Sequence, residues 1–223
     1  MSSRTVIIVA GPTAVGKTSV AIQLAQQFGT EIISVDSRQC YREMNIGVAR
    51  PSSKELEAVP HHFVASHSIQ EEINAGVFEQ YALAKTEVLF ANHPVIIMTG
   101  GSGLYIKAFC ENFKVMELKT LIEEAWVNRE LLQAGKHSDA VRAVIEEVDK
   151  GHLRVASPEA GKWVVNEWVK QAILMYFGIQ QMQTWTLPPF EFYDKMLLKS
   201  NYKELGVRAV PHAIARYGAY VAK

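Results

Sequence analysis

A short glycine-flanked loop near the N-terminus most constrains how this chain can fold. Gly11 and Gly16 enclose four residues, Lys17 and Thr18 follow, and the loop lies between an apolar run, RTVIIVA, and a helical pattern, TSVAIQLAQQF. Such a turn presents backbone N–H groups and a helix N-terminus to an anion, while the lysine neutralises phosphate oxygens and the threonine hydroxyl holds Mg²⁺. We predict a phosphate-binding loop, with Thr18 as magnesium ligand, that consists of Gly11, Pro12, Thr13, Ala14, Val15, Gly16, Lys17 and Thr18.

Buried strands and helices alternate through the first half of the chain. The β-branched apolar runs RTVIIVA, EIISV and PVIIMTG indicate strands buried on both faces. Gly29 is expected to end the helix TSVAIQLAQQF, and VFEQYALAKTEVLF has the apolar spacing of a second helix. Strands separated by helices pair in parallel, and ligands bind beyond their carboxyl ends. We expect an α/β fold, a P-loop NTPase-like parallel sheet flanked by helices, with the loop, Asp36 and the turn 100–105 at one edge.

Asp36 narrows the chemistry of this edge. A kinase or ATPase of this type carries its magnesium-holding carboxylate after a strand such as PVIIMTG, but that strand ends in Thr99 and glycine. Asp36 follows the strand EIISV instead, where its carboxylate can take a proton from a group beside the phosphates. An aspartate that only caps a turn is the alternative for this residue. The loop alone leaves open whether it holds a nucleotide or a leaving group, so an ATP-binding, small-molecule kinase is the alternative function.

Further motifs resemble the tRNA dimethylallyltransferase (tRNA isopentenyltransferase) family. GPTAVGKT, SVDSRQCYREMNIGVARP, PHHF, NAGVFEQYA and MTGGSGLY occur in that family's order and spacing, from about Thr5 to Phe113. The resemblance implies an enzyme that prenylates the adenosine next to the tRNA anticodon. Its loop would hold the diphosphate of dimethylallyl diphosphate with Mg²⁺, and pyrophosphate would leave as the exocyclic adenine nitrogen attacks the allylic carbon.

The resemblance also implies roles for single residues. Asp36 is the general base that takes the proton from the adenine nitrogen, and Thr13 and Ser102 lie near the reacting groups, Thr13 as a second catalytic residue. The tRNA contacts implied are Asp36, Ser37, Arg38, Gln39 and Ser102. The residues agree chemically with this reaction, because amine attack on an allylic diphosphate needs a charge sink for pyrophosphate and a carboxylate near the nitrogen. The target base must also be flipped out of its stack.

The sequence pattern changes near Lys114. The family's helical tRNA-gripping insertion and later arginine-containing motif do not follow Phe113. Residues from about Met116 to Lys223 instead resemble the N-terminal domain of tetrahydrodipicolinate N-succinyltransferase, a lysine-biosynthesis enzyme, through IEEVDKGHLRVA, WVVNEWVKQAILMYF, FYDK and LGVRAVPHAIARYGAYVAK. Arg208 matches a substrate-contacting arginine of that family, and a solvated surface arginine is the alternative.

We expect two domains: a truncated P-loop prenyltransferase-like domain at residues 1–114, and at 115–223 a small α+β domain that lacks the β-helix of the succinyltransferase. A gene fusion, a rearranged reading frame and an assembly artefact each account for such a join. Because nucleic-acid affinity scales with phosphate contacts, the missing insertion predicts weakened tRNA binding and weak or absent transfer. A non-catalytic chimera is therefore a third alternative.

Local patterns in the second region predict its elements. We expect amphipathic helices at MELKTLIEEAWVNRELLQ and at SDAVRAVIEEVDKG, the latter started by Ser138 and ended by Gly151. Short strands are expected near LRVA and KWVV, and Asn166 is expected to start the helix NEWVKQAILMYF.

Composition excludes some settings and leaves others open. The 223 residues carry 23 basic and 23 acidic side chains, so no net charge draws the chain to nucleic acid or acidic membranes. Two cysteines without metal or redox spacing, and no apolar run long enough for a membrane span, favour a cytoplasmic protein without a membrane partner. The oligomeric state stays open.

Overall fold

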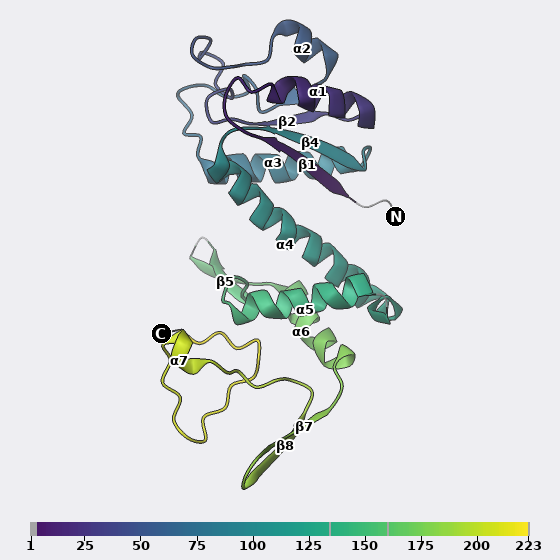
Figure 1. Cartoon of the computed structure of the whole chain (residues 1–223), viewed down its shortest axis with the longest axis vertical. Helices are drawn as coiled ribbons and strands as arrows, with labels where there is room; N and C mark the ends of the chain where they lie inside the picture. Colours follow the sequence, from purple (N-terminus) through teal and green to yellow (C-terminus); the bar gives the residue numbers. More distant parts are fainter. Residues whose placement is uncertain (1–3, 134, 160, 223) are drawn as a thin grey trace. The chain divides into compact units, whose positions relative to one another are not determined.

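The computed structural model describes residues 4–133, 135–159 and 161–222. The chain divides into two compact units, Met1–Lys114 and Val115–Lys223 (Figure 1). Residues 1–3, 134, 160 and 223, which the expected domains 1–114 and 115–223 include, lie outside the described residues.

The first unit contains a four-stranded parallel sheet with helices on both faces (Figure 1). The strands are β1 (Thr5–Ala10), β2 (Ile32–Val35), β3 (His61–His62) and β4 (Val95–Gly100). The helices are α1 (Lys17–Phe28), α2 (Ser53–Ala58), α3 (Ala75–Phe90) and the first turns of α4 (Gly103–Val127). The strand order is β1-β4-β2-β3 and every pair is parallel, which confirms the predicted α/β fold.

Strand register brings the loops of interest to one edge of the sheet. Gly100, the last residue of β4, pairs with Ala10 at the end of β1 and with Val35 at the end of β2. The three strands therefore end at the same level, and the segments that leave them start side by side. Ligands of open parallel sheets bind beyond this edge.

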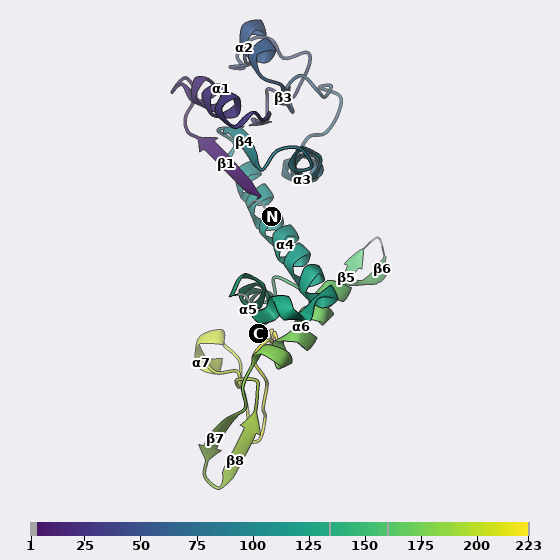
Figure 2. The ribbon, with the colours of Figure 1, turned by 90° about the vertical axis from the view of Figure 1, so that its right-hand side faces the viewer.

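Successive residues of the strands enter two apolar cores on opposite faces of the sheet. One core joins β2 and β4 to α3 and α4 through Ile33, Val35, Ile96, Met98, Phe78, Ala82 and Phe109. The other joins the same strands to α1 through Ile32, Ile97, Ala21 and Ala25. Figure 2 shows α1 and α3 on either side of the strands. Burial on both faces explains why these strands have continuous apolar runs, and it fixes the N-terminal end of α1 at the edge of the sheet.

Helix α1 ends as its sequence predicts. Gly29 adopts a left-handed conformation, with φ of 60°, and its N–H bonds back to carbonyls of the last turn. A residue with a side chain is disfavoured there, which is why glycine is the common terminator. The predicted stop at Gly29 is confirmed.

The second unit is a small α+β region. After α4 its elements are η1 (Arg129–Gln133), α5 (Gly135–Asp149), β5 (Ala156–Glu159), β6 (Lys162–Val165), α6 (Glu167–Ile179), β7 (Gln183–Leu187), β8 (Phe190–Asp194) and α7 (Tyr202–Leu205). The pairs β5–β6 and β7–β8 are antiparallel hairpins. Helices α4, α5 and α6 share a core that includes Ile122, Val141, Val144, Val169 and Ala172, all fully buried. The predicted helix after Asn166 is confirmed.

Three predicted elements in this region are present with different boundaries. The segment MELKTLIEEAWVNRELLQ is helical from Met116 to Val127, but the helix does not start at Met116, because α4 runs without a break from Gly103, a stretch with no proline and no internal glycine to end it. Helix α5 begins at Gly135, three residues before the predicted start at Ser138. Ser138 is buried within the helix, and its hydroxyl donates to the Gly135 carbonyl at 3.0 Å. Of the segment LRVA only its last residue is in a strand, because the pairing of β5 with β6 begins at Ala156.

Across the part of the chain that the structure describes, we find no helix with the length and apolar character that a membrane crossing requires.

Candidate functional site

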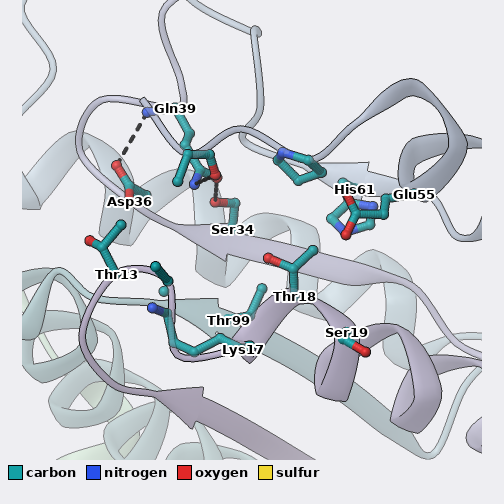
Figure 3. Close-up of a pocket in the computed structure, with 15 residues that line it drawn as sticks. Thr13, Lys17, Thr18, Ser19, Ser34, Asp36, Gln39, Glu55, His61 and Thr99 are labelled. Carbon is teal, nitrogen blue, oxygen red and sulfur yellow. Dashed lines mark hydrogen bonds between the residues drawn. The ribbon is translucent and has the colours of Figure 1, made fainter. Parts of the chain in front are cut away.

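A pocket of about 310 Å³ lies at the carboxyl edge of the parallel sheet (Figure 3). Residues of the predicted phosphate loop and the start of α1 line one wall, and Ser34 and Asp36 at the end of β2 line another. Thr99 and Gly100 at the end of β4 form part of the floor. The edge at which the sequence predicted a ligand site therefore carries a cavity.

Half of the predicted site residues line this pocket, and the other half do not. Those that line it are Thr13, Ala14, Gly16, Lys17, Thr18, Asp36 and Gln39. Gly11, Pro12, Val15, Ser37, Arg38 and Ser102 belong to adjacent segments without lining it. Arg208 is an exposed residue of the second unit.

The loop 11–18 is shaped to present backbone donors to an anion. Gly16 is the N-cap of α1 with φ of 91°, and Ala14 also has a left-handed φ, of 66°. Among the described residues no side chain caps the start of α1, so the N–H groups of its first turn are free to bind a ligand. The Lys17 ammonium donates to the Pro12 carbonyl at 2.6 Å and so folds back over the loop. This arrangement concentrates positive charge where phosphates would lie.

Asp36 caps a turn and also lines the pocket. Its Oδ1 atom accepts hydrogen bonds from the backbone N–H groups of Arg38 at 2.9 Å and of Gln39 at 3.3 Å, so the side chain does cap a turn. The same carboxylate lines the pocket opposite Lys17 and Thr13, as Figure 3 shows. Capping the turn therefore fixes the carboxylate at the cavity wall rather than removing it from the site.

Ser102 connects the segments that follow β2 and β4. Its hydroxyl accepts from the Ser37 N–H at 3.1 Å, and its own N–H donates to the Val35 carbonyl at 3.2 Å. Both bonds lie within the chain, next to the turn that holds Asp36. In this structure Ser102 therefore helps to hold that turn in place.

Gln39 has both ends of its side-chain amide bonded within the chain. Its Oε1 atom accepts from the Ser34 hydroxyl at 3.0 Å, and its Nε2 atom donates to the Ala49 carbonyl at 2.6 Å. Figure 3 shows the side chain between Asp36 and Ser34. The amide for which the resemblance implied a tRNA contact is thus hydrogen-bonded within the chain.

Two titratable residues of the pocket lining were not predicted from the sequence, Glu55 of α2 and His61 of β3. His61 Nδ1 lies 2.8 Å from the Val59 carbonyl and therefore carries the proton, while Nε2 is buried and has no partner among the described residues. Burial lowers the pKa of His61, which favours a neutral ring with an acceptor nitrogen at Nε2. The only sequence signal was the motif PHHF, which gives no indication that the chain between β2 and β4 folds back to the loop.

Glu55 belongs to a capping box that starts α2. The Ser52 hydroxyl accepts from the Glu55 N–H at 3.4 Å, and the Ser52 N–H and hydroxyl donate to Glu55 Oε2 at 2.8 Å and 2.7 Å. These bonds lower the pKa of Glu55, with the Ser52 hydroxyl as the main cause. The capping box therefore fixes the position of the Glu55 carboxylate, and Glu55 lines the pocket.

Replacing Ser52 with alanine should cost about 1 kcal/mol of unfolding free energy at neutral pH. Because the folded-state pKa of Glu55 is lowered, its contribution is present at neutral pH and disappears as the pH falls through that lowered value, so the variant should lose less stability on acidification. Urea unfolding at about pH 7 and about pH 4 measures both effects. Ser53→Ala, at the exposed first helical position, is the control; equal stability of the two variants would contradict the capping role.

Two family models match the chain. The isopentenyl transferase model matches residues 4–134, more than half of the sequence, and the model for the N-terminal region of tetrahydrodipicolinate N-succinyltransferase matches residues 117–179. The first match continues past Phe113, where the motifs of the sequence ended, and overlaps the second match over residues 117–134. Both families that the motifs resembled are therefore found in the order expected.

Several similar proteins are tRNA dimethylallyltransferases or isopentenylpyrophosphate transferases by name. The chain is 43% identical over 155 residues to the tRNA dimethylallyltransferase of Cytophaga hutchinsonii, a match that covers 69% of this chain and 47% of the relative. It is 51% identical over 109 residues to that of Christiangramia forsetii, covering 49% and 36%. A solved full-length tRNA isopentenylpyrophosphate transferase of Bacillus halodurans is 25% identical with a TM-score of 0.48, covering 78% of this chain and 55% of that one.

The chain spans about half, or less, of the length of the curated relatives it matches. The family itself is decided by the model that matches residues 4–134, within which lie the phosphate loop, Asp36 and the pocket they share. The chain belongs to the isopentenyl transferase family.

Proposed function

We propose that the first unit transfers a dimethylallyl group from dimethylallyl diphosphate to the exocyclic amine of the adenosine next to the anticodon of tRNA. The observation that supports this most is that the phosphate loop and the Asp36 carboxylate line one pocket. The relatives named tRNA dimethylallyltransferase support the choice of both substrates. A tRNA substrate would place the enzyme in the cytoplasm.

The loop would bind the diphosphate of the donor. Backbone N–H groups of the loop and of the first turn of α1 would donate to its oxygens, and the Lys17 ammonium would exchange the Pro12 carbonyl for a phosphate oxygen. This exchange replaces a neutral acceptor by an anionic one, so it is favourable. Ser19 and Thr99 also line the pocket, and their hydroxyl groups would contact the phosphates or the water around them.

The residues fit a magnesium ion that is held together with the donor. Among the described residues no three His, Cys, Asp or Glu side chains gather into a metal cage, and the Thr18 hydroxyl lines the pocket beside the loop. Mg²⁺ usually keeps several waters and binds through few protein ligands plus substrate phosphates. Thr18 would hold the ion, which when bound would neutralise charge on the departing pyrophosphate.

Asp36 would complete the transfer. As the adenine nitrogen forms its bond to the allylic carbon, the bond between that carbon and the diphosphate oxygen breaks, and the electron pair leaves with pyrophosphate. The nitrogen then carries an extra proton, which the Asp36 carboxylate would accept. The two backbone hydrogen bonds to Oδ1 hold the carboxylate in place for this step, and Thr13 lines the same pocket opposite it.

Ligand-induced thermal stabilisation tests the proposal. With Mg²⁺ present, dimethylallyl diphosphate and pyrophosphate should each raise the unfolding temperature more than ATP does, because the pocket is proposed to serve a leaving diphosphate. Prenyl incorporation into unmodified tRNA then tests the transfer itself. Strong stabilisation by ATP, with none by the prenyl donor or pyrophosphate, would contradict the proposal and favour a kinase.

Lys17→Met should weaken pyrophosphate binding by about 10- to 100-fold, because it removes a charge-assisted hydrogen bond while keeping the apolar stem of the side chain. Isothermal titration calorimetry with pyrophosphate and Mg²⁺ measures the change. Lys107→Met is the control, since Lys107 is an exposed residue of α4 whose charge faces Glu111. Equal affinities of the two variants would show that the loop lysine does not hold the diphosphate.

A further inference from the structure

The segment between β2 and α2 has little regular structure, although it carries Asp36 and roofs the pocket. Residues 36–51, called here the Asp36 loop, contain no helix or strand of the fold. Long loops of this kind need specific hydrogen bonds to hold one conformation, because they gain little from apolar burial. The contacts inside the Asp36 loop therefore decide where the Asp36 carboxylate lies.

Gln39 uses every polar group it has in these contacts. Its backbone N–H donates to Asp36 Oδ1 at 3.3 Å, and its carbonyl accepts from the Ala65 N–H at 2.9 Å. Its side-chain amide accepts from the Ser34 hydroxyl at one end and donates to the Ala49 carbonyl at the other. One residue thus links the catalytic turn, strand β2 and the far end of the same loop.

The bond to Ser34 supplies the fixed point. Ser34 is only 2% exposed and lies in β2 between two core residues, so the pairing of the sheet fixes its backbone position. The bond to Ala49 connects this anchor to the end of the Asp36 loop, where Pro51 and Ala49 line the pocket. Arg50 adds bonds from its guanidinium to the carbonyls of Tyr41 and Met44, which close the middle of the loop.

We propose that Gln39 is a positioning residue, which holds the Asp36 loop closed over the pocket and thereby fixes the Asp36 carboxylate beside the phosphate site. Only the effect of Gln39 on catalysis rests on the proposed function; its effect on the conformation of the Asp36 loop does not. The inference also assigns the Gln39 amide to the chain itself rather than to RNA, because its oxygen and its nitrogen are both hydrogen-bonded within the chain in this conformation.

A buried thiol within the Asp36 loop reports the opening of the loop without any need for catalysis. Cys40, the neighbour of Gln39, is fully buried, and burial raises the pKa of its thiol to about 11. The chain has two cysteines, and the other, Cys110, is exposed. In a Cys110→Ser background a disulfide reagent that releases a coloured thiolate therefore reacts only as fast as Cys40 becomes accessible.

The test compares variants of this Cys110→Ser chain at one pH. Gln39→Met keeps the length of the side chain but removes both amide bonds, and should label Cys40 at least about tenfold faster. Ser34→Ala removes one of the bonds and should give a smaller acceleration. Gln27→Met, at an exposed position of α1, is the matched control and should label at the parental rate. Pyrophosphate titration of Gln39→Met should show unchanged affinity, which establishes that the unit is folded.

A kinetic readout separates positioning from substrate binding. If the chain transfers prenyl groups, Gln39→Met should lower kcat about tenfold or more while KM for dimethylallyl diphosphate stays within about twofold. Parental labelling of Cys40 in Gln39→Met would overturn the inference whether or not the chain is active. A raised KM for tRNA with unchanged kcat would overturn it as well, because that result assigns Gln39 to RNA contact.

Discussion

Gly100→Ala is expected to destabilise the first unit by about 3 kcal/mol or more and to abolish pyrophosphate binding. A Cβ atom built on Gly100 would lie 2.0 Å from the Val35 carbonyl oxygen and 2.4 Å from its carbon. Both atoms are backbone of the neighbouring strand, so no side-chain rotation relieves the overlap. Strands β2 and β4 would have to separate at the point where both reach the pocket, and the wall that carries Asp36 would move with them.

Urea unfolding and pyrophosphate titration measure the two effects. Gly103→Ala provides a closely matched control, because Gly103 lies three residues further along at the start of α4, has no atom within 4 Å of its added Cβ, and is in a helix that favours alanine. That variant should be as stable as the parent or slightly more so. A Gly100→Ala protein with parental stability and pyrophosphate affinity would show that β2 and β4 do not approach this closely.

Asp36→Asn is expected to lower prenyl transfer by about 10²- to 10⁴-fold while leaving pyrophosphate affinity unchanged. Asparagine keeps an oxygen that can accept from the Arg38 and Gln39 N–H groups, so the turn stays capped. It does not take up the proton that the substrate amine must lose. The substitution therefore separates the proposed base role of Asp36 from its turn-capping role.

Initial rates of prenyl transfer and calorimetric titration with pyrophosphate provide the two readouts. Asp36→Ala removes the cap as well as the base, so it should also lose stability by about 1 kcal/mol, whereas Asp36→Asn should not. Asp139→Asn, an exposed acid of α5, controls for the change in charge. Parental transfer by Asp36→Asn would exclude Asp36 as the base and leave it only the structural role.

The parts of the first unit that could be predicted from sequence are those with strong local signals. Strands buried on both faces have continuous apolar runs, so β1, β2 and β4 were predicted within a residue or two at each end. The phosphate loop is defined by residues close together in sequence, and it lies between a strand and a helix as its pattern requires. The position of Asp36 at the same edge followed from the rule that parallel strands end together.

Other features were not predictable because their determinants are distant or weak. The change from one family's motifs to the other's near Met116 does not coincide with a break in the backbone, because α4 runs through it from Gly103 to Val127. Glu55 and His61 reach the pocket only because β3 pairs with β2 and brings the preceding helix with it. Pairing of a two-residue strand leaves almost no periodic signal in the sequence.

The sequence by itself determined the class of fold, the phosphate loop and the family, because each depends on residues within one strand–loop–helix segment or on linked motifs in fixed order. Only the tertiary structure decided how the loop 36–51 is held, because the bonds from Gln39 to Ser34 and Ala49 depend on side-chain rotamers and on the register of β2 against β4. The backbone bonds from Arg38 and Gln39 to Asp36 likewise become visible only in the folded chain, where the capped carboxylate lines the same pocket as the phosphate loop. Hydrogen bonds of this kind have no period and no fixed spacing, so they become visible only once the chain has folded.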